Sequence, residues 1–281
     1  MCPRVRRTPS RFANTFRTGV DVTEASIRVE RDETIATVVI DRPEKLNAMT
    51  KPLWQALGET IDTLSADDTL RCIILRGAGE KAFSPGNDIA EFRTDRSNVE
   101  QARAYGAIMH RTLGALDQCR HPIVAMIHGI CVGGGLEIAA MCDLRICGES
   151  SRFGVPIKNL GLVMAHAELD ALAKLAGPAV ALEILLEGRI FDAREAFTKG
   201  LVTRVVPDDQ VTAETLTTAR RIADGAPLVA RWHKQFVKRA MNPAPLTDAE
   251  RDEGFACFGT EDFRTGYQAF LDKVKPEFKG R

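Results

Sequence analysis

Apolar residues occur in two kinds of run along the 281 residues of this chain. The longer runs carry apolar residues every three or four positions, which is the period of an amphipathic helix. The shorter runs are rich in β-branched residues and predict buried strands. These strand-like runs lie at 35–40, 72–75, 123–127, 144–147 and 202–206. Strands that alternate with helices in this way predict an α/β core.

Polar residues at the ends of the runs indicate where elements begin. Thr50 can cap a helix that carries Pro52 in its first turn, and Asn98 can cap a second helix. Residues 27–40 read as a hairpin with its turn near 31–33. We expect three parts: a basic N-terminal tail at 1–24, the α/β core at 25–210 and a helical region at 211–281.

The composition narrows the classes of partner. Lys and Arg together number 38, as do Asp and Glu, so the net charge gives no reason to expect nucleic acid or a membrane surface. The seven cysteines form no C-x-x-C pair, and several lie in apolar runs. Free buried thiols are typical of a reducing compartment, so we expect a cytoplasmic protein.

The first 20 residues carry five arginines and no acidic residue. This pattern fits an organelle-targeting or nucleic-acid-binding arm, or simply a disordered tail. The absence of a clear apolar stripe favours the tail.

Two glycine-bearing segments, 84–88 and 133–137, carry the candidate chemistry. Glycines let a backbone approach a ligand closely, and a helix that starts there offers unpaired N–H groups. Such donors stabilise a carbonyl oxygen that gains negative charge, and Glu137 would supply an acid or base beside it. The same residues also fit a packing turn from strand to helix, with a carboxylate placed favourably at the helix N-terminus.

Several ordered motifs resemble the crotonase (enoyl-CoA hydratase/isomerase) superfamily. They include Asp-Arg-Pro-x-x-x-Asn-Ala, Ala-Phe-Ser-Pro-Gly-Asn-Asp-Ile and the stretch from His121 to Glu137 that contains three consecutive glycines. The matching segments are 41–48, 82–89, 121–137, 142–145, 153–156 and 200–202. The resemblance runs from about residue 27 to the C-terminus.

The resemblance implies a crotonase-like spiral of ββα units with a C-terminal helical oligomerisation region, assembled as a homotrimer or homohexamer. It implies an acyl-CoA thioester as substrate and no metal or further cofactor. It places the oxyanion donors on the N–H groups of Asn87 and Gly134, and a catalytic carboxyl on Glu137. The substrate contacts that it implies are Lys45, Leu46, Ala48, Ala82, Ser84, Gly86, Asp88, Ile89, Gly133 and Ile157.

One position departs from the family pattern. Hydratases of the family carry a second glutamate after the proline of Phe-Gly-x-Pro, and this chain has Ile157 there. Isomerases commonly keep that second glutamate rather than the first, so neither pattern fits. His166 or Glu168 could supply a replacement acid or base. The residues at 164–168 favour a structural role instead. A helix would start there, with the Glu168 carboxylate at its N-terminus and His166 solvated or packed.

We therefore expect a lyase or isomerase that acts on an enoyl- or 3-hydroxyacyl-CoA through an enolate. Thioester hydrolysis or decarboxylation on the same scaffold, or acyl-CoA binding without catalysis, are the alternatives. A G-x-G-x-x-A match at 77–82 is a weak nucleotide-binding signal, because the Pro-Gly pair at 85–86 interrupts the helix that should follow. Asp143 is expected to be a structural partner rather than a catalyst.

Overall fold

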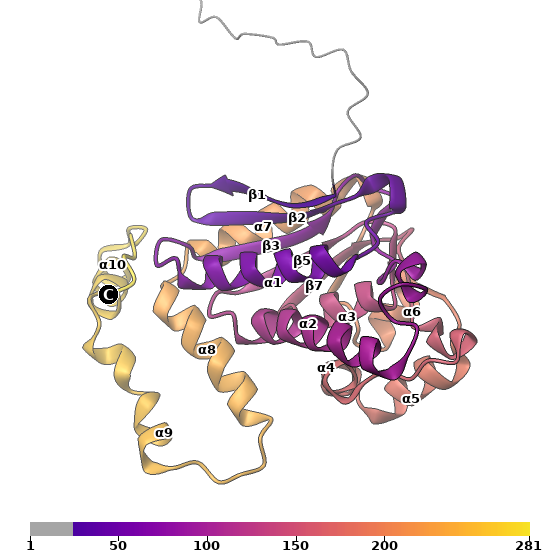
Figure 1. Ribbon diagram of the computed structural model, residues 1–281. Helices are drawn as coiled ribbons and strands as arrows, with labels where there is room; N and C mark the ends of the chain where they lie inside the picture. The colour runs from indigo at the N-terminus through magenta and orange to yellow at the C-terminus, as the bar shows by residue number, and fades with distance from the viewer. Residues whose placement is uncertain (1–24) are drawn as a thin grey trace, which may run out of the picture.

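The computed structural model describes residues 25–281, and its larger sheet has six strands (Figure 1). Their order is β1 (Ser26–Asp32), β2 (Ile35–Asp41), β3 (Cys72–Gly77), β5 (Ile123–Ile127), β7 (Leu144–Gly148) and β10 (Arg204–Val206). β1 is antiparallel to β2, and the other neighbours are parallel. The first two strands confirm the predicted hairpin, whose turn places Glu33 at a positive φ of 51°.

A smaller sheet contains β4 (Ala82–Ser84), β6 (Ile130–Val132), β8 (Arg152–Gly154) and β9 (Phe191–Asp192), in that order. The first three strands are parallel to one another. The chain passes through one strand of each sheet and then a helix, three times in succession. The repeats are β3–β4–α2, β5–β6–α3 and β7–β8–α4, with α2 at Val99–Gln118, α3 at Gly134–Met141 and α4 at His166–Ala176. This arrangement confirms the predicted spiral of ββα units.

Helices cover both faces of the larger sheet. α1 (Lys51–Ala66) begins after Thr50, whose hydroxyl accepts the Leu53 N–H, and α2 begins after Asn98, which caps it in the same way. The buried stripe of α1, which includes Trp54, belongs to the main hydrophobic core. α7 (Val211–Ala223) packs with residues of β2, β3, β5 and β7 in a second cluster. The first helix of the predicted C-terminal region thus packs on the core.

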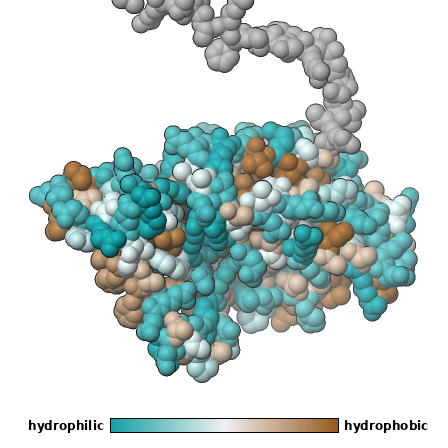
Figure 2. Space-filling view, turned by 60° about the vertical axis from the view of Figure 1, so that its left-hand side comes forward, coloured by the Kyte–Doolittle hydropathy of each residue, from teal (hydrophilic) through white to brown (hydrophobic). Residues whose placement is uncertain are grey.

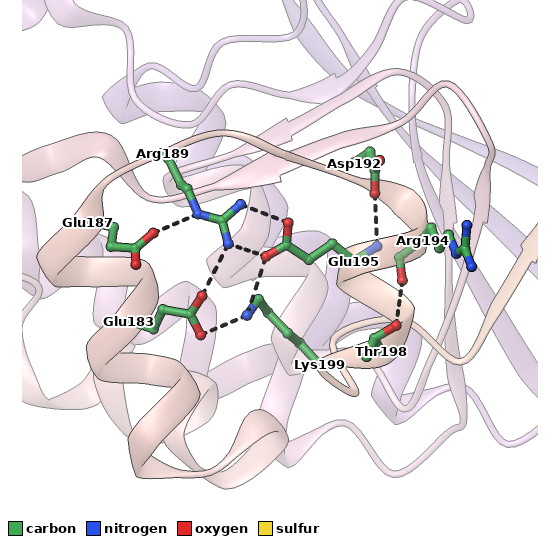
Figure 3. A network of polar contacts seen from close by, with 8 residues as sticks. All are labelled: Glu183, Glu187, Arg189, Asp192, Arg194, Glu195, Thr198 and Lys199. Atoms are coloured by element: carbon green, nitrogen blue, oxygen red, sulfur yellow. Dashed lines mark hydrogen bonds and ion pairs between the residues drawn. The ribbon is translucent and has the colours of Figure 1, made fainter.

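A network of charged side chains joins the helices that flank β9 (Figure 3). α5 (Pro178–Glu187) lies before that strand, and α6 (Ala193–Thr198) follows it. Arg189 donates to Glu187 at 2.6 Å and to Glu195 at 2.7 Å, while Lys199 donates to Glu183 at 2.7 Å. These contacts hold the segment that leads into β9.

The helices after α7 form an arm that extends from the core (Figure 1). We call residues 227–281, which hold α8 (Pro227–Ala240), α9 (Asp248–Glu253) and α10 (Glu261–Asp272), the C-terminal arm. Lys234 anchors it, because its ammonium group donates to the Asp143 carboxylate at 2.8 Å and to the His121 carbonyl at 2.9 Å. Asp143 also accepts the Ile123 N–H at 2.7 Å, so it has the structural role that the sequence predicted.

Short 3₁₀ helices occupy several turns of the fold. They are η1 (Pro43–Lys45), η2 (Ile89–Phe92), η3 (Pro156–Leu160), η4 (Asp208–Gln210) and η5 (Ala256–Gly259). Between residues 25 and 281, no helix combines the length and the apolar character needed to span a membrane. The predicted N-terminal tail lies outside the described residues.

Candidate active site

The two glycine-bearing turns lie side by side. β4 and β6 are parallel neighbours, so the turns that follow their carboxyl ends lie at the same edge of the small sheet. A Cβ atom added to Gly86 would collide with the Gly134 nitrogen, and one added to Gly134 would lie 3.6 Å from the Asn87 nitrogen. The amides of Asn87 and Gly134 are therefore neighbours, and only glycine fits at position 86.

Both amides lack an acceptor among the residues that the structure describes. The N–H groups on either side of Asn87 are used: that of Gly86 donates to Ser84 Oγ, and that of Asp88 donates to the Met49 carbonyl at 2.8 Å. The Asn87 N–H makes no such bond within residues 25–281. Gly134 is the first residue of α3, where a backbone N–H has no acceptor inside the helix.

Side-chain contacts fix the Asn87 turn in place. The indole N–H of Trp54 donates to the Asn87 side-chain oxygen at 2.7 Å. Trp54 is fully buried in α1, so the turn is tied to the main core. The Asn87 side chain is thus occupied, and its backbone N–H is the group left to act.

Glu137 is a buried carboxyl in the first turn of α3. Its side chain is 7% exposed, and its Oε2 atom has no hydrogen-bond partner within residues 25–281. Burial, with a smaller contribution from the nearby charge of Glu168, raises its pKa to about 8, while Arg96 opposes the shift. At neutral pH the protonated form of Glu137 is therefore favoured, which suits a proton donor.

A second carboxyl lies close to Glu137. Glu168 is buried in the first turn of α4, where its Oε2 accepts the Ala165 N–H at 2.9 Å. Its Oε1 lies 3.2 Å from Nε2 of His110, which comes from α2. The three helices of the spiral repeats thus bring together His110, Glu137 and Glu168. Glu168 caps its helix, which is the role that the sequence favoured, and it also lies near Glu137.

His110 was not predicted from the sequence, which offered His166 or Glu168 as the replacement acid or base. His166 is exposed and makes no hydrogen bond or ion pair with residues 25–281. His110 precedes Leu113 by three positions, so it lies near the buried stripe of α2. That spacing could have suggested a partly buried histidine, but the sequence does not show that α4 packs beside α2.

Ile157 lies at the turn after β8, which neighbours β6. Its side chain is partly buried and packs against the main hydrophobic cluster. An apolar group therefore occupies the third turn at this edge of the sheet, and the carboxyl that lies near Glu137 is that of Glu168 on α4.

The other residues predicted to contact the substrate differ in exposure and in whether their side chains are already bonded within the protein. Ser84 donates to the Asn47 carbonyl at 2.8 Å, and the Asp88 carboxylate accepts from Arg42 at 2.7 Å. These two side chains hold the loops together. Leu46 and Ala82 line a cavity of about 220 Å³. Lys45 and Ile89 are exposed, Ala48 is buried, and Gly86 and Gly133 form the two turns at positive φ.

A spiral of ββα units that brings two free amides beside a buried carboxyl pair defines a protein of the crotonase class. Residues 30–281 match the family model described as enoyl-CoA hydratase/isomerase. The chain belongs to this family.

Relatives of known name support the same assignment. The chain is 34% identical over 263 residues to a probable enoyl-CoA hydratase of Mycobacterium bovis, covering 92% of this chain and all of the relative. It is 32% identical to a crotonyl-CoA hydratase of Syntrophomonas wolfei, covering 90% and 97%. A crystal structure named as an enoyl-CoA hydratase/carnithine racemase from Magnetospirillum magneticum matches with a TM-score of 0.90 and 49% identity, covering 92% and 97%.

Proposed function

We propose that this protein is an enzyme that hydrates an enoyl-CoA thioester reversibly, with the amides of Asn87 and Gly134 holding the thioester oxygen. The observation that carries the proposal is the adjacency of these two amides beside Glu137. Preorganised donors at an oxygen that gains negative charge typically lower a barrier by about 3–4 kcal/mol each. The names of the relatives, several of which are enoyl-CoA hydratases, support the same substrate class.

The two carboxyls divide the proton transfers. Ionised Glu168 accepts a proton from water as the water oxygen bonds to C3 of the enoyl group, and the electron pair of the double bond moves toward the thioester oxygen. Protonated Glu137 then gives its proton to C2, which restores the thioester carbonyl. The raised pKa of Glu137 supports the donor role. The position of Glu168 beside Glu137, with Oε1 3.2 Å from His110 Nε2, supports the base role. A proton passed from Glu168 back to Glu137 completes the cycle.

The coenzyme A part of the substrate would lie along the loop at 45–48 and the segment 82–89. The cavity beside Leu46 and Ala82 fits this placement, as does the exposure of Lys45. The proposed mechanism uses only groups of the chain and the thioester itself, so it calls for no metal or further cofactor.

The C-terminal arm is proposed to bind other copies of this chain in a homotrimer or homohexamer. Large apolar side chains on the arm are exposed, and Figure 2, which brings this side forward, shows hydrophobic and hydrophilic residues interleaved on the surface. They include Val237, Met241, Phe255, Phe258, Phe270 and Leu271. An exposed apolar set of this kind marks an interaction surface. Light scattering coupled to size-exclusion chromatography tests the stoichiometry.

Turnover of crotonyl-CoA and a 3-enoyl-CoA, followed by absorbance and mass spectrometry, tests the reaction. Hydration adds the mass of one water to crotonyl-CoA and removes the absorbance of its conjugated double bond. Migration of the double bond in the 3-enoyl-CoA without a change in mass would instead show isomerisation. Release of free CoA thiol would show hydrolysis. Tight binding without turnover would show a member that only binds acyl-CoA.

A further inference from the structure

Arg96 lies near enough to Glu137 to affect its charge, and it forms no ion pair with an acid in residues 25–281. It is in the bend between η2 and α2, and its positive charge opposes the pKa shift of Glu137. Its Nε and Nη1 atoms are inaccessible to solvent and have no hydrogen-bond partner within residues 25–281. Leaving donors of a charged group buried and unsatisfied is costly, so these two donors call for an acceptor that residues 25–281 do not supply.

Two aromatic rings lie against the Arg96 guanidinium. Its central carbon lies 4.6 Å from the centre of the Phe92 ring and 4.8 Å from that of Tyr105. Contact with aromatic rings stabilises the cation without using its N–H donors. Tyr105 is itself fixed, because its hydroxyl donates to Glu91 at 2.7 Å, and Glu91 also accepts the Lys51 N–H. The guanidinium is therefore preorganised.

The charge of Arg96 is also left uncompensated by its neighbour. Burial favours the neutral form of Glu137, so this carboxyl does not cancel the positive charge. Glu168 is engaged by His110 and by the Ala165 N–H. A planar, fork-shaped cation with free N–H groups matches a carboxylate, which accepts two parallel hydrogen bonds from it.

We propose that Arg96 binds a carboxylate on the acyl group of the substrate, so that the preferred substrate is the CoA thioester of a dicarboxylic acid. This inference rests on the proposed function, since it assumes that an acyl-CoA occupies the site beside Glu137. Arg96 is then a specificity-determining residue.

Binding measurements test the inference without depending on turnover. The probes are the CoA thioesters of butanedioic, pentanedioic and hexanedioic acids and the matching terminal carboxamides, measured by isothermal titration calorimetry. We expect the wild-type protein to bind at least one carboxylate ester roughly tenfold to a hundredfold more tightly than its carboxamide. Arg96→Gln should abolish this preference and leave the affinity for the carboxamide unchanged. Arg96→Lys, which keeps the charge but not the fork, should retain part of it.

Arg93→Gln is the matched control, because Arg93 lies in the same bend with an exposed side chain. This variant should keep the wild-type preference. Equal binding of acid and amide by the wild-type protein at all three lengths would overturn the inference, as would an unchanged preference in Arg96→Gln. A changed oligomeric state in Arg96→Gln would also overturn it, since Arg96 would then serve a contact between copies. Failure of the proposed function itself would appear separately, as the absence of turnover on crotonyl-CoA, on a 3-enoyl-CoA and on the 2-enoyl forms of the same three diacid thioesters.

Discussion

Two clusters of charged side chains in this molecule are built in opposite ways. Around Arg189, each of the three glutamates has a base within ion-pair distance, and the cluster lies at the surface (Figure 3). Around Glu137, the carboxyls of Glu137 and Glu168 are buried, and both Glu137 and Arg96 keep atoms without a partner within residues 25–281. A satisfied surface network mainly holds elements together, whereas buried unsatisfied groups cost stability and are retained where a ligand or a reaction uses them.

The largest difference between the two clusters is expected when the carboxyl of Glu137 is replaced. Glu137→Gln keeps the shape of the side chain but cannot transfer a proton. We expect turnover of the enoyl-CoA to fall by about 10²–10⁴-fold, with acyl-CoA affinity changed far less. Steady-state kinetics together with calorimetric binding measure the two effects. Glu59→Gln on the exposed face of α1 is the control and should behave as wild type. Unchanged turnover in Glu137→Gln would remove this residue from the mechanism.

A methyl group on Gly86 tests the pair of amides. The added Cβ would collide with the Gly134 nitrogen, and the positive φ of 90° disfavours any side chain there. Gly86→Ala should therefore separate the two donors and lower turnover by about 10²–10³-fold. The control is Gly114→Ala in α2, where an added Cβ meets no atom within 4 Å. Wild-type kinetics in a folded Gly86→Ala protein would contradict the role of the two amides.

Replacing His110 tests the role of the Glu168 carboxyl. His110→Gln removes the imidazole that contacts Glu168, so we expect turnover to fall about tenfold and its dependence on pH to change. His166→Gln alters the exposed neighbour of Glu168 and should leave both kinetics and pH profile as in wild type. A larger effect of His166→Gln would contradict the assignment of His110 as the histidine that acts with Glu168.

The stability of the buried cluster should depend on pH with a definite sign. The pKa of Glu137 is raised from 4.5 in the unfolded chain to about 8 in the folded protein, so the folded state binds more protons between these values. Stability from this group is therefore present below pH 4.5 and is lost as pH rises toward 8. Glu137→Gln should melt several degrees higher than wild type near pH 8, and the difference should shrink near pH 5. Thermal melts at both pH values check this.

The sequence predicted the parts of the site that are local in the chain. The glycine turns, the helix starts after Thr50 and Asn98, and the buried strands each depend on a few consecutive residues. Three consecutive glycines at 133–135 indicated a close approach of backbones, and Gly135 does lie against the Ser84 carbonyl.

The second carboxyl could not be assigned in the same way. His110 and Glu168 are 58 residues apart, and their contact exists because the spiral stacks α4 beside α2. The sequence offered Glu168 both as a helix cap and as an acid or base, and it favoured the helix cap, which the structure shows. Arg96 gave no signal, since its importance depends on the rings of Phe92 and Tyr105 folding around it.

The smallest effect is expected at the satisfied cluster. Arg189→Gln removes the centre of the network in Figure 3, but its partners are exposed to water and can be hydrated instead. We expect the melting temperature to fall by roughly 2 °C or less and turnover of the enoyl-CoA to stay as in wild type. The Arg189 carbonyl lies against Gly154 at the end of β8, so the backbone still closes the small sheet after the side chain is lost. A large loss of turnover in this variant would mean that the surface network positions the site, and the contrast between the two clusters would fail.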